Sequence, residues 1–249
     1  MYYFVSDVHL GGGTPKEAQK AEERFLAWLD SVADSATAIF ICGDLFDFWF
    51  EYKRVVPKGF VRTLGRIAHL TDRGVRVVFM AGNHDQWLRD YFAVECGMEV
   101  YARPQIFELG GGKRVHVAHG DGLNVKNDPI LKAMNSTFRS AWVRALFSTF
   151  VHPDLALKFG QWWSRSSRTK HVNTNYEGQD RAIEALVEYA TEVHGQEHAD
   201  YYIFGHLHAV EDRTIGDQGE ARVIFVNDWR VNPHCAVMDA EGNVTIKEI

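Results

Sequence analysis

The chain has 249 residues, of which 46% are hydrophobic and 24% are charged, proportions that are ordinary for a globular protein and exclude a wholly disordered chain. Its net charge of −6 disfavours a general nucleic-acid-binding protein, so we expect no nucleic-acid partner. Without a signal peptide or a run of roughly 20 apolar residues, the sequence predicts a cytoplasmic protein that has no membrane span.

Apolar runs rich in β-branched and aromatic residues alternate with amphipathic helical patterns along the first part of the chain. Strands are predicted at 2–6, 38–42 and 75–80, and helices at 15–32 and 58–72. This alternation of strands and helices is typical of α/β proteins. Further strands are predicted at 114–118, 201–204, 222–226, 236–239 and 244–247.

A long helical stretch interrupts this plan, with predicted pieces at 129–151, 153–166 and 175–194. Because the two strands that flank it end in histidine motifs, we expect a helical cap over the site, about residues 123–195, inserted into one domain of residues 1–249. Residues 126–171 carry eight Lys and Arg residues against two acidic ones. This reversal of charge indicates an anionic partner, and a solvated helical face is the alternative.

Five predicted strands end in polar clusters that contain potential metal ligands. The clusters are Asp7-Val8-His9, Gly43-Asp44, Gly82-Asn83-His84-Asp85, His119-Gly120-Asp121 and Gly205-His206-Leu207-His208. Ligands of covered sheets bind beyond the carboxyl ends of the strands, so we expect the clusters to converge. Carboxylate, amide and imidazole groups without cysteine indicate Mn, Fe or Zn.

The spacing within the clusters suggests how the ligands share a site. On an extended backbone, residues two apart face the same side, which would align Asp7 with His9 and His206 with His208. The carboxylate of Asp44 could bridge two ions. Each cluster alone could be structural, but burial of so many ionisable groups without a metal would cost several kcal/mol per unpaired group.

The blocks D-x-H, G-D-x-x-D, G-N-H-D, H-G and G-H-x-H, in this order, resemble the motifs of the calcineurin-like metallophosphoesterases. The resemblance implies an α/β fold, a two-sheet sandwich flanked by helices, with two divalent metal ions, Mn²⁺ or else Fe or Zn. It implies that one ion is held by Asp7, His9, Asp44 and His208. The second would be held by Asp44, Asn83, His119 and His206.

A narrower resemblance, to the bacterial UDP-2,3-diacylglucosamine hydrolases of lipid A biosynthesis, is carried by SDVHLG, GDLFDFW, HGDGLNVKND and RVIFVNDW. It implies water attack on the diphosphate of a lipid-linked nucleotide sugar, giving UMP and 2,3-diacylglucosamine 1-phosphate (lipid X). It also implies a peripheral contact with the cytoplasmic face of the inner membrane. The chain departs from that group at His84, where Arg is typical, and at GHLHAV, where GHTHRP is typical.

Several roles follow from the resemblance and from two-metal chemistry. Asp44 and His84 are the expected catalytic residues: Asp44 bridges the ions, and His84 stabilises the transition state or protonates the leaving group, with Asp85 as a candidate to orient it. Asp47 and Asp121 are expected to orient histidines. The expected substrate contacts are Asn83, His84, Asp128, Ser166, Ser167 and Lys170.

The insertion repeats large apolar residues at helical spacing, including Trp142, Phe147, Phe150, Trp162 and Trp163. Such stripes usually pack onto a core. Alternatively they form a groove for two acyl chains and rest on an anionic membrane. Two other functions stay open: hydrolysis of a different phosphoester or nucleotide-linked diphosphate, and a non-catalytic scaffold of the same fold.

Overall fold

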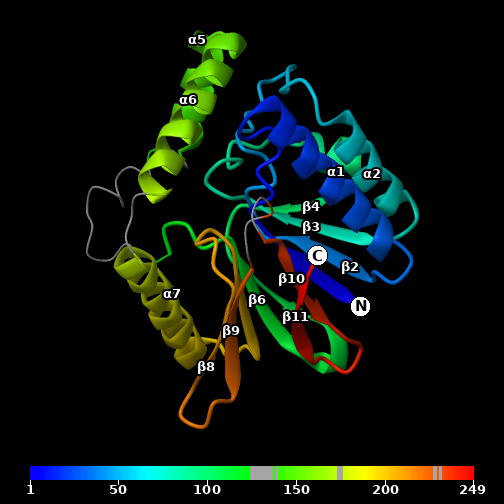
Figure 1. Cartoon of the computed structure of the whole chain (residues 1–249), viewed down its shortest axis with the longest axis vertical. Helices are drawn as coiled ribbons and strands as arrows, with labels where there is room; N and C mark the ends of the chain where they lie inside the picture. Colours follow the sequence, from blue (N-terminus) through cyan, green and yellow to red (C-terminus); the bar gives the residue numbers. More distant parts are fainter. Residues whose placement is uncertain (124–136, 138–139, 173–175, 227–228, 230–231) are drawn as a thin grey trace.

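The computed structural model consists of two β-sheets that pack face to face, with helices on their outer faces (Figure 1). It describes the chain except for residues 124–136, 138–139, 173–175, 227–228 and 230–231. The buried layer between the sheets joins Phe4, Phe40 and Val78 of the first sheet to Val117 and Ile203 of the second. This apolar layer supplies the contact that holds the two sheets together.

The first sheet has the order β11-β10-β1-β2-β3-β4. Its parallel part contains β1 (Tyr2–Val5), β2 (Ala38–Ile41), β3 (Arg76–Met80) and β4 (Glu99–Tyr101). The hairpin of β10 (His234–Met238) and β11 (Val244–Glu248) joins β1 in antiparallel fashion. All four residues of β2 are buried, as expected for a strand that is covered on both faces.

The second sheet has the order β5-β6-β7-β9-β8. Its strands are β5 (Gln105–Glu108), β6 (Arg114–Ala118), β7 (Tyr201–Phe204), β8 (Glu211–Ile215) and β9 (Ala221–Phe225). The three central strands β6, β7 and β9 run parallel to one another. Their carboxyl ends therefore lie at one edge of the sheet.

Helices α1 (Pro15–Val32), α2 (Val61–Asp72) and the short α3 (Tyr91–Cys96) pack against the first sheet. A capping box starts α1, in which the Thr14 side chain accepts from the Glu17 backbone and Glu17 accepts from the Thr14 backbone. On the second sheet, Ile183, Leu186 and Ala190 of α7 (Tyr176–Gln196) pack onto Tyr202 and Phe204. A 3₁₀ turn at Gly110–Gly112 connects β5 to β6.

Helices α5 (Ala141–Phe150) and α6 (Pro153–Val172) stand beside the loops that follow β2 and β3 (Figure 1). Phe147 of α5 contacts Phe50 and Trp87, with ring centroids 5.2 and 5.1 Å apart. The Tyr52 hydroxyl donates to the Val151 carbonyl at 2.9 Å. These contacts fix the end of α5 on the loops that carry the predicted site. Among the described residues, every helix is too short or too polar to cross a bilayer.

The predicted fold class is confirmed, and the differences concern the ends of elements and four short elements that were not predicted. α2 begins at Val61 rather than Lys58, because Phe60 takes a left-handed conformation with φ of 60°. α6 extends to Val172, beyond the predicted residue 166. The helix predicted at 129–151 is described only from Ala141, because most of its first part lies outside the described residues. Sequence patterns missed α3, β4, β5 and β8.

Candidate metal centre

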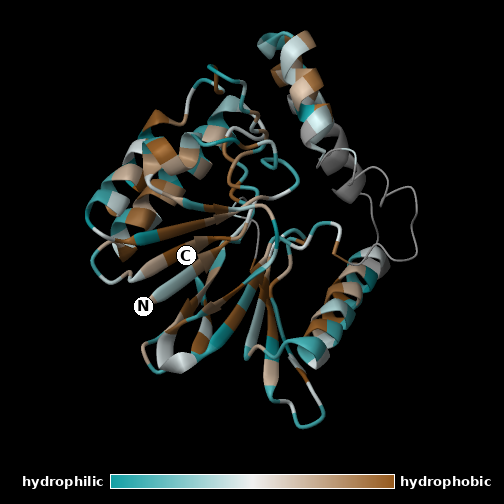
Figure 2. Ribbon diagram, turned by 180° about the vertical axis from the view of Figure 1, so that it is seen from behind, coloured by the Kyte–Doolittle hydropathy of each residue, from teal (hydrophilic) through white to brown (hydrophobic). Residues whose placement is uncertain are grey.

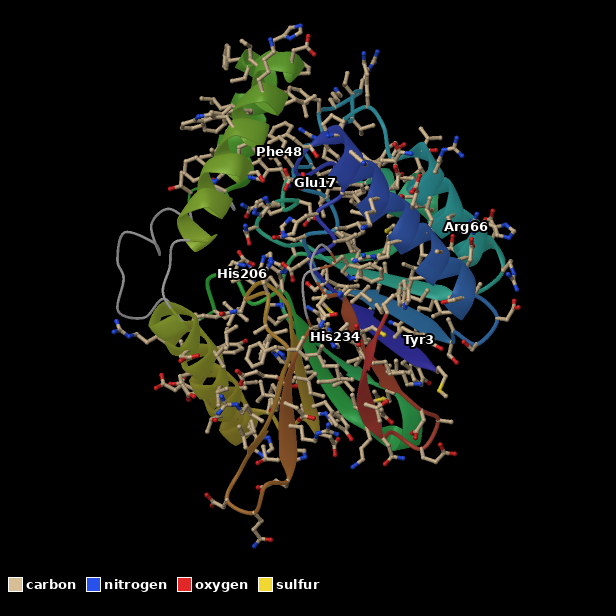
Figure 3. The ribbon with its side chains drawn as sticks, in the orientation of Figure 1. Tyr3, Glu17, Phe48, Arg66, His206 and His234 are labelled. Atoms are coloured by element: carbon tan, nitrogen blue, oxygen red, sulfur yellow. The ribbon has the colours of Figure 1, made fainter. Side chains whose placement is uncertain are left out.

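The five polar clusters lie beyond the carboxyl ends of β1, β2, β3, β6 and β7, and the two sheets bring them together (Figure 3, near His206). Backbone hydrogen bonds connect the loops: Asp7 N donates to the Gly43 carbonyl at 3.1 Å, and Gly205 N donates to the His119 carbonyl at 2.9 Å. The His206 N–H also donates to Asp7 Oδ2 at 2.9 Å. This last bond joins the edge of the second sheet to the edge of the first.

At most of the predicted ligands the backbone is left-handed rather than extended, and this conformation directs their side chains. Among the described residues, six non-glycine residues have positive φ, and five of them are predicted ligands: Asp7 (55°), His9 (49°), Asp44 (51°), His206 (69°) and His208 (52°). The expectation that an extended backbone aligns each pair two residues apart is therefore wrong. Non-glycine residues adopt this conformation rarely, and it is concentrated at functional sites.

Two glycines let the clusters approach one another closely. A Cβ atom on Gly205 would overlap Ser6 Oγ and Asp7 Oδ2, and one on Gly82 would overlap Asp44. Both positions therefore exclude any side chain while the ligands stay in place. Ser6, which the sequence patterns did not single out, donates from its hydroxyl to the Cys42 and Gly43 carbonyls at 3.0 and 3.2 Å. It connects the first two clusters.

One half of the site is formed by Asp7, His9 and His208, whose ligand atoms face one another. Asp7 Oδ1 lies 3.7 Å from Nε2 of His9 and 3.7 Å from Nε2 of His208. Asp44 Oδ2 is 3.9 Å from His9 Nε2. These four residues are the set expected for the first ion.

The other half is centred on His119, whose tautomer is fixed by a backbone carbonyl. Its Nδ1 donates to the Cys42 carbonyl at 2.9 Å, so Nε2 is the ring atom that faces the site. That atom is 3.1 Å from Asn83 Oδ1 and 3.4 Å from Asp44 Oδ2. The ring of His206 meets the ring of His119 edge-on, with centroids 5.1 Å apart. The structure thus brings all four residues expected for the second ion together.

Unsatisfied polar atoms show that this set fits metal ions. Asp7 Oδ1 and both ring nitrogens of His9 are buried and lack a hydrogen-bond partner among the described residues. Leaving such groups unpaired costs about 1–3 kcal/mol each. Three overlapping groups offer ligand atoms within 4.8 Å of one another: Asp7, His9 and His208; His9, Asp44 and His84; and Asp7, Asp44 and His119. Divalent cations would satisfy these oxygen and nitrogen atoms together.

The electrostatics of the site favour ionised carboxylates and a neutral His206, whereas for His119 burial is outweighed by the neighbouring Asp44, which raises its pKa well above the usual value. Burial opposes ionisation of Asp7, but the neighbouring ring of His9 and the charges of His208 and His119 outweigh it and lower its pKa to about 2. For Asp44, burial is likewise outweighed by His119 and His84, so its pKa lies well below the usual value. Burial lowers the pKa of His206 to about 4. Ionised carboxylates and a neutral imidazole are the forms that bind metal.

His84 is oriented by Asp47 rather than by Asp85, which corrects the expectation from sequence. Its Nδ1 lies 2.7 Å from the Asp47 carbonyl, and its Nε2 lies 3.9 Å from Asp44 Oδ2. Asp85 is buried and accepts from the backbone N–H of Gly82 at 2.8 Å, which braces the loops of the site. Asp47 Oδ1 lies 3.8 Å from His9 Nδ1, and Asp121 acts electrostatically on His119 and His206.

The remaining predicted substrate contacts belong to the insertion. Asp128 lies outside the described residues. Ser166, Ser167 and Lys170 lie on α6, but their side chains are outside the described part of the structure. Their roles stay predictions.

Residues 2–210 match the calcineurin-like phosphoesterase family. A Porphyromonas gingivalis protein named UDP-2,3-diacylglucosamine hydrolase is 38% identical, over 91% of this chain and 89% of that protein. A Blochmanniella pennsylvanica protein of the same name is 28% identical, over 91% of this chain and 87% of that protein. Vps29 of Entamoeba histolytica, a solved structure, covers 100% of this chain and 97% of its own at 11% identity, with a TM-score of 0.44. The family match and the converging ligands together show that the chain belongs to the calcineurin-like phosphoesterases, which are metal-dependent hydrolases.

Proposed function

We propose that the chain hydrolyses the diphosphate of UDP-2,3-diacylglucosamine with water, giving UMP and 2,3-diacylglucosamine 1-phosphate. The observation that carries this proposal is a complete set of ligands for two metals beside an apolar helical insertion. The similarity to the Porphyromonas gingivalis protein supports the choice of substrate, because 38% identity extends over 91% of this chain.

Two divalent ions, for which we propose Mn²⁺, occupy the centre. Asp7, His9, Asp44 and His208 hold the first ion, and Asp44, Asn83, His119 and His206 hold the second. When bound, such a pair supplies an activated water and neutralises charge on the phosphate oxygens. Asp44 belongs to both sets because its Oδ2 lies within 3.4–3.9 Å of His119 and His9 nitrogens.

His84 is the residue that handles a proton beside the centre. Its Nδ1–H is engaged by the Asp47 carbonyl, so Nε2 is the atom that holds or releases a proton toward the reacting groups. The backbone N–H of His84 donates to Asp44 Oδ1 at 2.9 Å, which keeps the ring next to the bridging carboxylate. His84 and Asn83 are the proposed contacts of the diphosphate.

The acyl chains are proposed to enter a cavity beneath the insertion. This cavity of about 290 Å³ lies between α6 and the core, and Leu10, Phe48, Phe60 and Leu157 form much of its wall. Each buried methylene would contribute about 0.8 kcal/mol to binding. Asp47 also lines the cavity, so it adjoins the metal centre. Asp128, Ser166, Ser167 and Lys170 of the insertion are proposed to contact the head group.

The outer surface of α5 and α6 is proposed to rest on the anionic cytoplasmic face of the inner membrane. Trp142 and Phe150 are 82% and 79% exposed, and Leu146 and Trp162 are exposed as well. Figure 2 shows hydrophobic residues on turns of these helices that stand away from the sheets. Exposed apolar patches of this kind mark interaction sites, and the basic residues of the segment suit an anionic lipid surface.

The direct test is the release of UMP from UDP-2,3-diacylglucosamine by the Mn²⁺-loaded protein, measured beside the hydrolysis of p-nitrophenyl phosphate. Turnover of the acylated nucleotide sugar at a much higher kcat/KM supports the proposal. Hydrolysis of the aryl phosphate alone would replace it with a phosphatase of small substrates. Hydrolysis of neither compound would favour the non-catalytic scaffold.

A further inference from the structure

Two hollows adjoin the metal centre, and each one meets a different half of it. The cavity of about 290 Å³ shares Asp47 with the centre, and Asp47 lies 3.8 Å from His9. A much smaller recess of about 10 Å³ is lined by His119 and Asp121. His9 and His119 belong to the two halves that Asp44 joins. A substrate that crosses the centre would therefore place one end in each hollow.

We propose that the UMP half of the substrate lies over the recess beside His119 and that Arg103 binds its phosphate. This inference rests on the proposed function. It fixes the direction of the substrate, with the diacylglucosamine half toward α6 and the nucleotide half toward the loop that joins β4 to β5. Hydrolysis breaks one P–O bond of the diphosphate and adds water. In this orientation, the UMP product leaves from the side of the recess.

The two hollows differ in size in a way that decides which half fits where. A space of about 10 Å³ holds about one water molecule. It cannot enclose an acyl chain, so it suits only a group that lies over its mouth, such as a hydrated nucleotide. The larger cavity has room for hydrocarbon, and Leu10, Phe48, Phe60 and Leu157 give it an apolar wall.

The charged residues that line the two hollows support the same placement of the two halves of the substrate. The larger cavity is lined by Asp47 and Asp154 against one cation, Lys58. The recess is lined by Arg103 against one carboxylate, Asp121, which acts on the neighbouring histidines. A nucleotide phosphate is therefore less repelled at the recess than in the larger cavity.

Arg103 is connected to the ligand loop by the sheet. The residue follows β4, where Tyr101 pairs with Met80 of β3, and Ala81 N donates to the Tyr101 carbonyl at 2.8 Å. Asn83 comes two residues after Ala81, so the loop with Arg103 and the loop with this ligand share one anchor. Arg103 is exposed, and among the described residues no carboxylate forms an ion pair with it. Its guanidinium is available for the paired hydrogen bonds that bind phosphate.

The test compares Arg103→Ala and Arg103→Lys with wild type in the Mn²⁺-loaded full chain. We expect Arg103→Ala to raise the Kd of UMP and the KM of the acylated UDP-sugar about tenfold, the equivalent of about 1.4 kcal/mol. Arg103→Lys should recover part of this loss. The Kd of 2,3-diacylglucosamine 1-phosphate should stay at the wild-type value, because that product occupies the other hollow.

A matched control is Arg213→Ala, which removes an exposed arginine of β8 that pairs with Glu211. It should leave both product affinities unchanged. An unchanged Kd of UMP in Arg103→Ala, or equal weakening of both products, would overturn the assignment of the recess while wild-type hydrolysis keeps the proposed function. Failure of the wild type to hydrolyse the acylated UDP-sugar would instead refute the proposed function.

Discussion

At the scale of single residues, the metal centre combines strained backbone with buried charge. Five ligands adopt left-handed φ values, which costs on the order of 1–3 kcal/mol each for a non-glycine residue. Several of their polar atoms are also buried without a hydrogen bond. An arrangement with both costs persists because the surrounding sheets fix it and bound cations compensate for it.

Asp44→Ala tests the bridging role. Because Asp44 Oδ2 lies close to nitrogens of both His119 and His9, its loss should remove both ions. Turnover should fall by more than the roughly 10–100-fold cost of removing a group that only orients a ligand. Metal analysis and kcat measure the two effects, and Asp212→Ala on β8 is the control. Two retained ions with normal turnover would disprove the bridge.

His84→Ala separates a proton-transfer residue from a metal ligand. We expect retained metal and a kcat about 10²- to 10⁴-fold lower, the usual contribution of general acid–base catalysis. His84 Nε2 lies 3.9 Å from Asp44 Oδ2 and belongs to one of the possible ligand groups. Loss of an ion in this variant would therefore make His84 a ligand.

His116 should make stability depend on pH. It is 3% exposed on β6 among the rings of Tyr189, Tyr202 and Phe204, and burial lowers its pKa from 6.5 to about 4. Between these values the unfolded chain binds more protons than the folded one. The free energy of unfolding should therefore fall as pH drops through this window, by up to about 1.4 kcal/mol per pH unit.

Urea unfolding of wild type and His116→Phe at several pH values measures this contribution. The variant keeps an aromatic ring but cannot titrate, so the difference in stability between the two proteins should change with pH only below about 6.5. Parallel pH dependences of the two proteins would show that the pKa of His116 is the same in the folded and unfolded states, which would contradict the prediction.

At the scale of elements, the sequence predicted the strands well and their ends less well. The apolar runs that became β1, β2, β3, β6 and β7 are buried on both faces, so their composition alone identifies them. β8 was missed because its residues Glu211–Ile215 are mostly charged or polar, as an edge strand tolerates. The start of α2 depends on the left-handed Phe60, which no apolar pattern reveals.

The candidate site could likewise be predicted from the sequence only in part. Residue type and position after a strand were enough to select the seven candidate ligands, and the structure brings them together. The partner of His84 could not be found in this way, because it is a backbone carbonyl, and every residue has one. Likewise, the turns that aim Asp7 and His9 arise from tertiary hydrogen bonds to the Gly43 and Asp44 carbonyls.

The contact between α6 and the loop after β2 depends on Gly160. A Cβ atom at this position would collide with the ring of Phe48. Gly160→Ala should therefore displace α6 and lower stability by about 1–3 kcal/mol. It should also raise the KM of the acylated substrate, because Phe48 and Leu157 line the larger cavity. Chemical unfolding and steady-state kinetics measure both effects.

Two controls isolate the steric origin of this effect. Gly195 of α7 has open space around it, so Gly195→Ala should stabilise by up to about 1 kcal/mol through helix propensity alone. Adding Phe48→Ala to Gly160→Ala should be less harmful than the sum of the two changes. Strict additivity would show that Gly160 does not meet Phe48.

At the scale of the whole molecule, the two sheets present the metal centre at one edge, and α5 and α6 stand beside that edge (Figure 1). Residues 126–171 are basic in a chain of net charge −6. Apolar side chains on α5 and α6 are exposed as well. An anionic bilayer would thus attract the side of the molecule that we propose to bind the acyl chains, which would orient the centre toward a substrate held in the membrane.

The double variant Trp142→Ser and Phe150→Ser tests this orientation by co-sedimentation with vesicles that contain phosphatidylglycerol. Full burial of a large apolar side chain is worth about 1.5–3 kcal/mol, so even partial insertion of both should make wild-type partitioning at least tenfold stronger. Val61→Ser with Val94→Ser is the matched control, because these residues are 77% and 71% exposed on α2 and α3. Equal loss of vesicle binding in both double variants would indicate nonspecific hydrophobic adsorption. Loss confined to the α5 variant would identify the insertion as the membrane face.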